Sequence, residues 1–109
     1  MGNYTDEKLQ KIWEKGIEVK NYDKDLYRKD VCGAWMKRDE YGRIESNYGW
    51  EVDHKKPESL GGSYELENLR PMQWANNRNK EDDYPVYTSV VTSEGDKNVN
   101  IEREWEIKQ

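Results

Sequence analysis

The chain has 109 residues, of which 38% are charged, and its formal net charge is −5. This length fits one domain, and the single cysteine excludes an intramolecular disulfide and any zinc site built on several thiolates. No apolar run reaches membrane-spanning length and no apolar stretch typical of a signal peptide opens the chain, so we expect a cytoplasmic protein without membrane contact.

The first half of the chain predicts one helix and two strands. A helix start is indicated by Thr5-Asp6-Glu7, and apolar residues follow at helical spacing at Leu9, Ile12 and Trp13. We expect strands over 27–36 and 48–54, joined by a polar loop. In the second strand Trp50 and Val52 alternate with Glu51 and Asp53, as on two faces of a sheet.

The second half predicts an ordered loop, a helix and a hairpin. Residues 55–67 are too rich in glycine and proline for regular structure. Pro71 can open a helix running to about Lys80, since proline is tolerated in a first turn. The segments 86–92 and 99–107 predict a β-hairpin. Five Trp and eight Tyr replace the missing Phe, so we expect an aromatic core.

The acidic excess of the chain lies at its C-terminal end. Residues 81–109 hold 3 basic and 8 acidic groups, whereas residues 53–80 hold 5 basic and 4 acidic groups. Binding to phosphates requires only a local cationic face. The net negative charge therefore does not exclude a nucleic-acid partner.

Residues with catalytic potential occur in order between positions 50 and 80. His54 is the only histidine of the chain, and it directly follows Asp53 at the end of the alternating run. The later elements of the series are Pro57, Gly61-Gly62, Asn68-Leu69 and Asn77-Arg78-Asn79-Lys80. This series resembles the core of HNH endonucleases, in the variant whose metal ligands are Asp and Asn, and small standalone phage and bacterial members in particular.

The resemblance spans roughly residues 28–82 and implies an α+β protein with a ββα-metal core. Strand, loop, strand, ordered loop and helix would then form the core over 28–82. The N-terminal helix and the C-terminal hairpin would be additions that complete a single domain over 1–109. The Cys-x-x-Cys pairs that hold structural zinc in many HNH domains are missing, so no structural zinc is expected.

The resemblance also implies a role for each polar residue. His54 would be the general base, because histidine can take a proton near neutral pH. Asp53 and Asn77 would bind one divalent ion, and their oxygen atoms favour Mg²⁺ or Mn²⁺ over Zn²⁺. Asn68 would pin the loop and orient His54. Candidates for phosphate contact are Lys80, which has a motif position, and also Lys55, Lys56, Arg70 and Arg78.

Several alternatives stay open at the level of sequence. A shift of one residue in helix phase would exchange Asn77 for Asn76 as the metal ligand. We expect DNA as the substrate in preference to RNA, with one strand nicked unless a homodimer cuts both. The alternative is a catalytically inactive module on the same scaffold that binds nucleic acid or protein. The acidic face formed by Glu102, Glu104 and Glu106 would then serve such a partner or mimic the charge of DNA.

Overall fold

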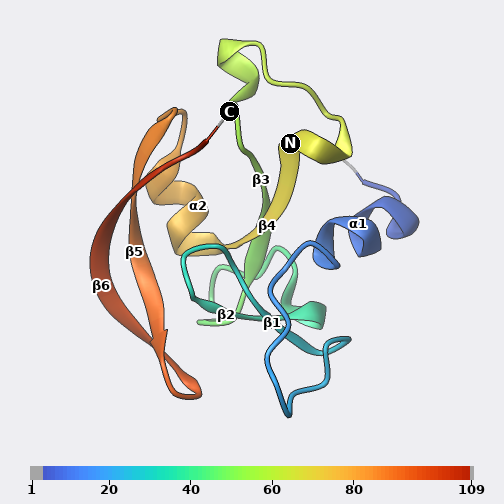
Figure 1. Cartoon of the computed structure of the whole chain (residues 1–109). Helices are drawn as coiled ribbons and strands as arrows, with labels where there is room; N and C mark the ends of the chain where they lie inside the picture. The colour runs from blue at the N-terminus through green and yellow to red at the C-terminus, as the bar shows by residue number, and fades with distance from the viewer. Residues whose placement is uncertain (1–3, 109) are drawn as a thin grey trace.

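The computed structural model describes residues 4–108, which form two α-helices and three two-stranded antiparallel sheets (Figure 1). In chain order the elements are α1 (Asp6–Trp13), β1 (Tyr27–Lys29), β2 (Trp35–Lys37), β3 (Trp50–His54), β4 (Leu69–Gln73), α2 (Trp74–Lys80), β5 (Val86–Glu94) and β6 (Lys97–Glu106). The α+β class is therefore confirmed. Among the described residues, no helix is long and apolar enough to cross a membrane.

Helix α1 begins where the sequence predicts. The Thr5 hydroxyl accepts a hydrogen bond from the Lys8 backbone N–H (3.1 Å), which satisfies one of the free donors of the first turn. The buried face of the helix consists of Leu9, Ile12 and Trp13. Its function in the fold is to cover one side of the core.

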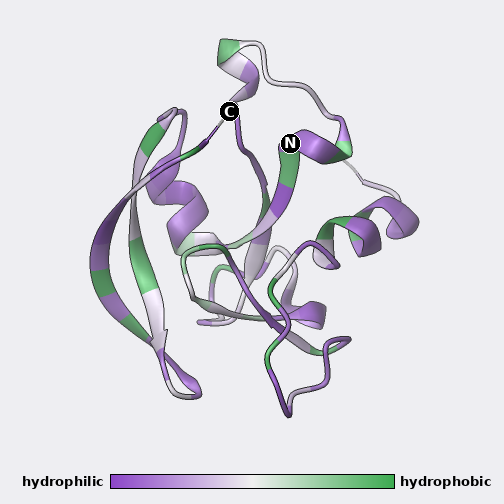
Figure 2. Cartoon of the chain, viewed as in Figure 1, coloured by the Kyte–Doolittle hydropathy of each residue, from purple (hydrophilic) through white to green (hydrophobic). Residues whose placement is uncertain are grey.

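The core has two clusters, both dependent on aromatic residues. In the first, α1 packs on Met36, Trp50 and Leu69, and the rings of Trp13 and Trp50 lie 5.2 Å apart. The second joins the hairpin to the rest of the chain through Cys32, Met72, Tyr87, Trp105 and Ile107. Figure 2 shows only scattered green bands in a chain that is mostly purple or white. The expectation of an aromatic core is confirmed.

The strand predicted over 27–36 is interrupted by a tight turn. Gly33 has a φ of 89°, a left-handed conformation that glycine adopts without steric penalty. The Asp30 carboxylate closes the turn by accepting hydrogen bonds from the backbone N–H groups of Cys32 (2.9 Å) and Ala34 (2.8 Å). The two halves, β1 and β2, therefore pair with each other.

The partner of β3 is β4, of which residues 71–73 were predicted to belong to a helix. The pair runs from Trp50 opposite Gln73 to His54 opposite Leu69. Pro71 therefore lies inside a strand, and α2 begins only at Trp74. The backbone N–H of Gln73 points away from β3 and donates to Asp30 (3.0 Å). Pro71, two residues earlier, faces the same outer edge, so its missing N–H removes no hydrogen bond between the strands.

The hairpin of β5 and β6 confirms the prediction for the C-terminal segment. It forms the long curved ribbon beside α2 in Figure 1. The Asn76 side chain on α2 joins the two elements, because its oxygen accepts from the backbone N–H groups of Val90 and Val91 (2.8 Å each). Helix α2 is thereby held between the hairpin and the β3–β4 pair.

Candidate functional site

Two adjoining hollows follow the free edge of β3 and form one groove, here called the β3 groove. They share four lining residues, Val52, His54, Glu58 and Asn77. The larger hollow, of about 400 Å³, is lined in addition by Tyr4, Tyr41, Gly42, Glu51, Tyr64 and Arg78. The smaller, of about 230 Å³, adds Asp53, Pro57, Glu81 and Asp82. The structure therefore brings the three residues expected at the reaction, Asp53, His54 and Asn77, to one groove.

His54 ends β3 and has an unsatisfied ring nitrogen. The imidazole packs edge-on against Tyr64, with ring centroids 4.6 Å apart and planes at 85°. Within residues 4–108, His54 Nε2 is the buried side-chain polar atom that has no hydrogen-bond partner. Most buried polar atoms of a folded protein are paired, and an exception calls for an explanation such as a catalytic role or a bound water or ion.

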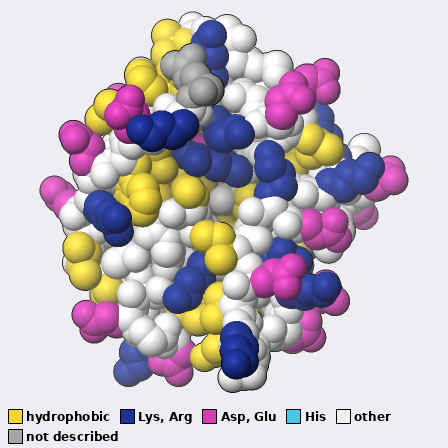
Figure 3. Space-filling model, viewed as in Figure 1, with side chains coloured by type: hydrophobic (Ala, Val, Ile, Leu, Met, Phe, Trp, Pro, Cys, Tyr) yellow, Lys and Arg dark blue, Asp and Glu magenta, His cyan; other side chains and the backbone are white. Residues whose placement is uncertain are grey.

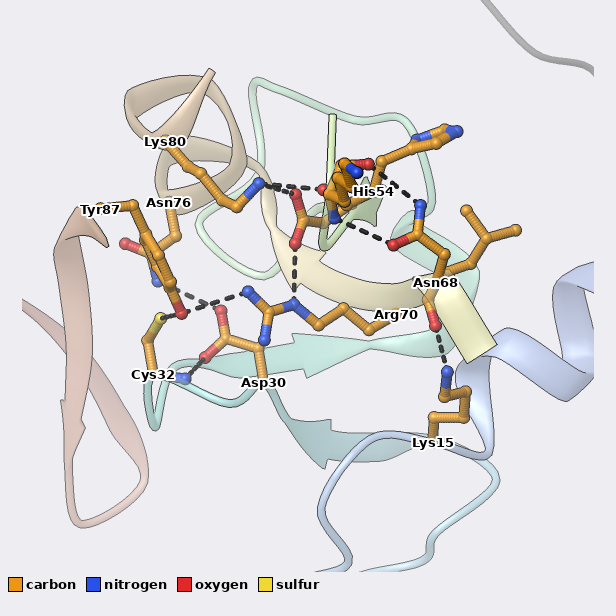
Figure 4. Close-up of polar contacts among 12 residues, drawn as sticks. Lys15, Asp30, Cys32, His54, Asn68, Arg70, Asn76, Lys80 and Tyr87 are labelled. Atoms are coloured by element: carbon orange, nitrogen blue, oxygen red, sulfur yellow. Dashed lines mark hydrogen bonds and ion pairs between the residues drawn. The ribbon is translucent and has the colours of Figure 1, made fainter. Parts of the chain in front are cut away.

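Asp53 is buried and is held by two cations. Its Oδ2 accepts from Arg70 Nε (2.7 Å), and its Oδ1 lies 3.1 Å from Lys80 Nζ. Figure 4 shows Lys80 reaching from α2 and Arg70 reaching from β4 toward the carboxylate between them. The side chain of Asp53 is only 3% exposed. Arg70 and Lys80 therefore supply the hydrogen bonds and the opposite charge that stabilise its carboxylate in place of water.

Lys80 does not have the position expected of a phosphate contact. Its side chain is fully buried, and its ammonium donates to the backbone oxygen of His54 (2.9 Å) besides pairing with Asp53. In this arrangement the ammonium cannot reach a phosphate in the β3 groove. Lys80 instead ties the last turn of α2 to the end of β3.

Arg78 is the predicted phosphate contact that lines the β3 groove. Its side chain is 56% exposed and donates to Glu51 Oε2 (2.9 Å). Lys55 and Lys56 follow His54 in the chain, and neither lines the groove described above. A phosphate could therefore bind the exposed Arg78 guanidinium by displacing the half-buried carboxylate of Glu51.

A second group of cations lies outside the β3 groove. Lys15 donates to the backbone oxygens of Leu66 (2.5 Å) and Leu69. The pKa of Lys15 is lowered, first by its burial and then by the positive charges of Lys55 and Arg70. Figure 3 shows Lys and Arg side chains gathered in the upper half of one face, on which no histidine side chain is visible.

Asn68 holds the loop that follows His54. Its amide nitrogen donates to the backbone oxygens of Lys56 (3.0 Å) and Ser63 (2.9 Å), and its amide oxygen accepts from the Lys56 N–H (2.9 Å). Gly62 permits this close packing, because a Cβ there would lie 1.7 Å from the Lys56 backbone oxygen. Asn68 therefore fastens both ends of the loop in front of the β3 groove.

The structure assigns different positions to the two adjacent asparagines of α2. Asn76 is fully buried, and besides binding the hairpin it donates to Asp30 Oδ2 (3.1 Å) and the Val91 backbone oxygen (2.9 Å). Asn77 is half-buried and lines the β3 groove. Of the two, Asn77 is therefore the one that can meet a ligand in the groove.

Asp53 and Asn77 offer oxygen atoms that fit a hard divalent cation. A carboxylate has about four lone-pair positions, and Arg70 and Lys80 use two of those of Asp53. Asn77 donates through its nitrogen to Glu51 Oε1 (3.0 Å), and its oxygen accepts no hydrogen bond from residues 4–108. Within that range no three His, Cys, Asp or Glu side chains form a ready cluster, so water would supply further ligands, as Mg²⁺ commonly requires.

Sequence reasoning did not identify Glu51 or the tyrosines of the groove. For Glu51 a signal existed, because it shares a strand face with Asp53 at a spacing of two residues. For Tyr4, Tyr41 and Tyr64 no signal existed, because they come from three segments that only the tertiary structure brings together.

Comparison of the chain with protein-family models, with curated proteins and with solved structures finds no match. The function is therefore inferred from the β3 groove itself.

Proposed function

We propose that the protein is a metal-dependent endonuclease of the HNH type, which hydrolyses DNA phosphodiester bonds with His54 as general base. The order β3, β4 and α2 supports this proposal, because it places strand, strand and helix around Asp53, His54 and Asn77. The two strands of the ββα unit are then β3 and β4, followed by α2, whereas the sequence predicted that its strands would be residues 27–36 and 48–54.

The observation that carries the proposal is the unpaired Nε2 of His54 in a groove shared with two oxygen ligands. A general base needs a free nitrogen lone pair directed at the attacking water. A purely structural histidine would be expected to hydrogen-bond through this atom. The backbone around His54 is held by Lys80 and by the loop that Asn68 fastens.

The charge of the β3 groove supports a requirement for a metal. Besides Asp53, whose charge Arg70 and Lys80 compensate, its acidic lining consists of Glu51, Glu58, Glu81 and Asp82, and its cationic side chain is Arg78. Such a lining repels a phosphodiester unless a cation is present. Asp53 and Asn77 would hold that cation, which when bound would neutralise the phosphoryl oxygens and the leaving oxygen. Arg78 would contact a neighbouring phosphate.

A second function has one observation in its favour. Asp53 pairs with two cations of the chain itself, Arg70 and Lys80, as expected of a structural carboxylate. A catalytically inactive module that binds nucleic acid or protein would retain this network and would tolerate His54→Ala. Dependence of cleavage on both His54 and a divalent ion separates the two functions.

The test is nicking of supercoiled plasmid by the purified protein in Mg²⁺ or Mn²⁺. We expect open circles with wild type, and none with EDTA, His54→Ala or Asn77→Ala. Asp53 is unsuited as the diagnostic position, because its removal leaves Lys80 buried without a counter-charge, at a cost of about 3–5 kcal/mol. Equal nicking by wild type and by a folded His54→Ala variant would overturn the proposal.

A further inference from the structure

The larger part of the β3 groove has an aromatic wall. Tyr41 packs on the buried Trp50 with centroids 4.9 Å apart, which gives it a fixed position. Tyr64 comes from the loop after β3 and is 41% exposed, and Tyr4 precedes α1. Together they form the aromatic wall, which lies beside His54 in a hollow of about 400 Å³.

The chemistry of this wall suits a nucleobase better than a phosphate. Aromatic rings stack on the flat face of any base. The phenols stay neutral, since burial raises the pKa of Tyr4 to about 12 and also raises the pKa of Tyr41. Glu51 and Glu58 in the same hollow can accept hydrogen bonds from the amino groups at base edges.

The position of Tyr64 links such a base to the reaction. Its ring packs against the imidazole whose Nε2 is closed off from solvent. Water can reach that nitrogen only when the neighbouring groups shift. A base that stacks on Tyr64 would draw the ring toward itself and place the adjoining phosphate next to His54.

We infer that the aromatic wall binds an unpaired base next to the cleaved phosphate, an inference that rests on the proposed endonuclease function. The substrate would then be single-stranded or locally unpaired DNA. In a duplex both faces of each base are covered by neighbouring bases. Such a base would enter the groove only after unstacking, which costs a few kcal/mol.

The experiment compares a fluorescein-labelled single strand with the duplex of the same sequence. Cleavage is followed in Mg²⁺, and binding is followed by anisotropy in Ca²⁺, which takes the same oxygen ligands, with a gel of each sample to show that the strand is uncut. Removing one stacking residue typically weakens binding by roughly 5- to 100-fold per base. We expect a loss of binding in this range for Tyr64→Leu on the single strand only, whereas the aromatic replacements Tyr64→Phe and Tyr64→Trp should keep the preference for binding the single strand.

Tyr22→Leu is the matched control, because Tyr22 is also 41% exposed but packs on Trp35 away from the β3 groove. Equal cleavage of single strand and duplex, with Tyr64→Leu behaving as wild type, would refute the inference and leave the endonuclease intact. Cleavage of neither substrate, with a Tyr64-dependent preference for binding single strands in Ca²⁺, would refute the endonuclease and leave the base site intact. Should Tyr64→Leu not fold, loss of the single-strand preference in Tyr64→Phe or Tyr64→Trp would decide against stacking.

Discussion

Asn76 and Asn77 are neighbours in α2 with the same side chain and opposite environments. The Asn76 amide donates to Asp30 and Val91 and accepts from two backbone N–H groups of β5. Asn77 makes one side-chain hydrogen bond, to Glu51, at the surface of the β3 groove. Helix geometry separates the two by 100° around the axis, so that one faces the hairpin and the other faces the groove.

Alanine at each position should separate stability from activity. We expect Asn76→Ala to lower the free energy of unfolding by about 3 kcal/mol or more, because several buried partners lose their hydrogen bonds. Asn77→Ala should lower it by about 1 kcal/mol or less and should abolish nicking. Urea titrations and plasmid assays measure the two effects.

The control for this pair is Asn79→Ala, which removes one exposed hydrogen bond to the Thr88 backbone oxygen. It should keep both stability and nicking. Full nicking by Asn77→Ala would contradict the proposal that Asn77 holds a divalent ion.

At the scale of elements, the loop between β3 and β4 depends on one side chain. Asn68 makes three hydrogen bonds to Lys56 and Ser63, and these bonds bridge 12 and 5 residues of sequence. The loop carries Tyr64 and Glu58 to the β3 groove. Its shape therefore decides the surroundings of His54.

We expect Asn68→Ala to free this loop while leaving the rest of the fold in place. Amide exchange over residues 55–67 should accelerate, and nicking should fall by about tenfold or more, since displaced catalytic groups lose orientation. The free energy of unfolding should fall by about 1–3 kcal/mol. Asn100→Ala, an exposed hairpin position, serves as the control. Unchanged nicking with a loosened loop would contradict a positioning role.

Short sequence patterns correctly predicted the elements that are determined by residues close together in the chain, namely α1, β3 and the C-terminal hairpin. The Thr5 cap marks α1, and alternation marks β3 and the hairpin. The predicted helix start at Pro71 was wrong. A proline is tolerated in β4 because its position without an N–H lies on the edge that faces away from β3, and the local sequence does not show which edge that is. The expected phosphate contact of Lys80 rested on its motif position alone, which gives no information about the burial of its side chain beside Asp53.

At the scale of the whole molecule, the hairpin of β5 and β6 supports the site through its contact with Arg70, on the side away from the β3 groove. Tyr87 on β5 accepts from Arg70 Nη2 (3.2 Å), and Arg70 in turn holds Asp53. The same tyrosine contacts Cys32 in the second core cluster. A segment outside the resemblance therefore supports a residue inside it, and the sequence contains no local signal of this contact.

Docking of the hairpin can be followed through Cys32. Burial, and next the charge of Asp30, raise the pKa of this thiol to about 12. The thiolate fraction at about pH 8 is then lower by roughly a thousandfold than for an ordinary cysteine. We expect iodoacetamide to label Cys32 slowly in the native protein and rapidly in urea.

The raised pKa also has a consequence for stability. Because the folded state retains the proton, the free energy of unfolding should fall as the pH rises from the ordinary cysteine value toward about 12. Labelling of the native protein at the rate of free cysteine would show that the hairpin is not docked on the core.

The central claim is that the His54 imidazole takes the proton of the attacking water. The most direct measurement is the rate of Mg²⁺-dependent plasmid nicking by His54→Ala, with and without added imidazole. We predict a loss of about a hundredfold or more relative to wild type, with partial recovery as imidazole enters the space left in the β3 groove. Nicking by a folded His54→Ala variant at the wild-type rate, or no nicking by wild type with either Mg²⁺ or Mn²⁺, would contradict the claim.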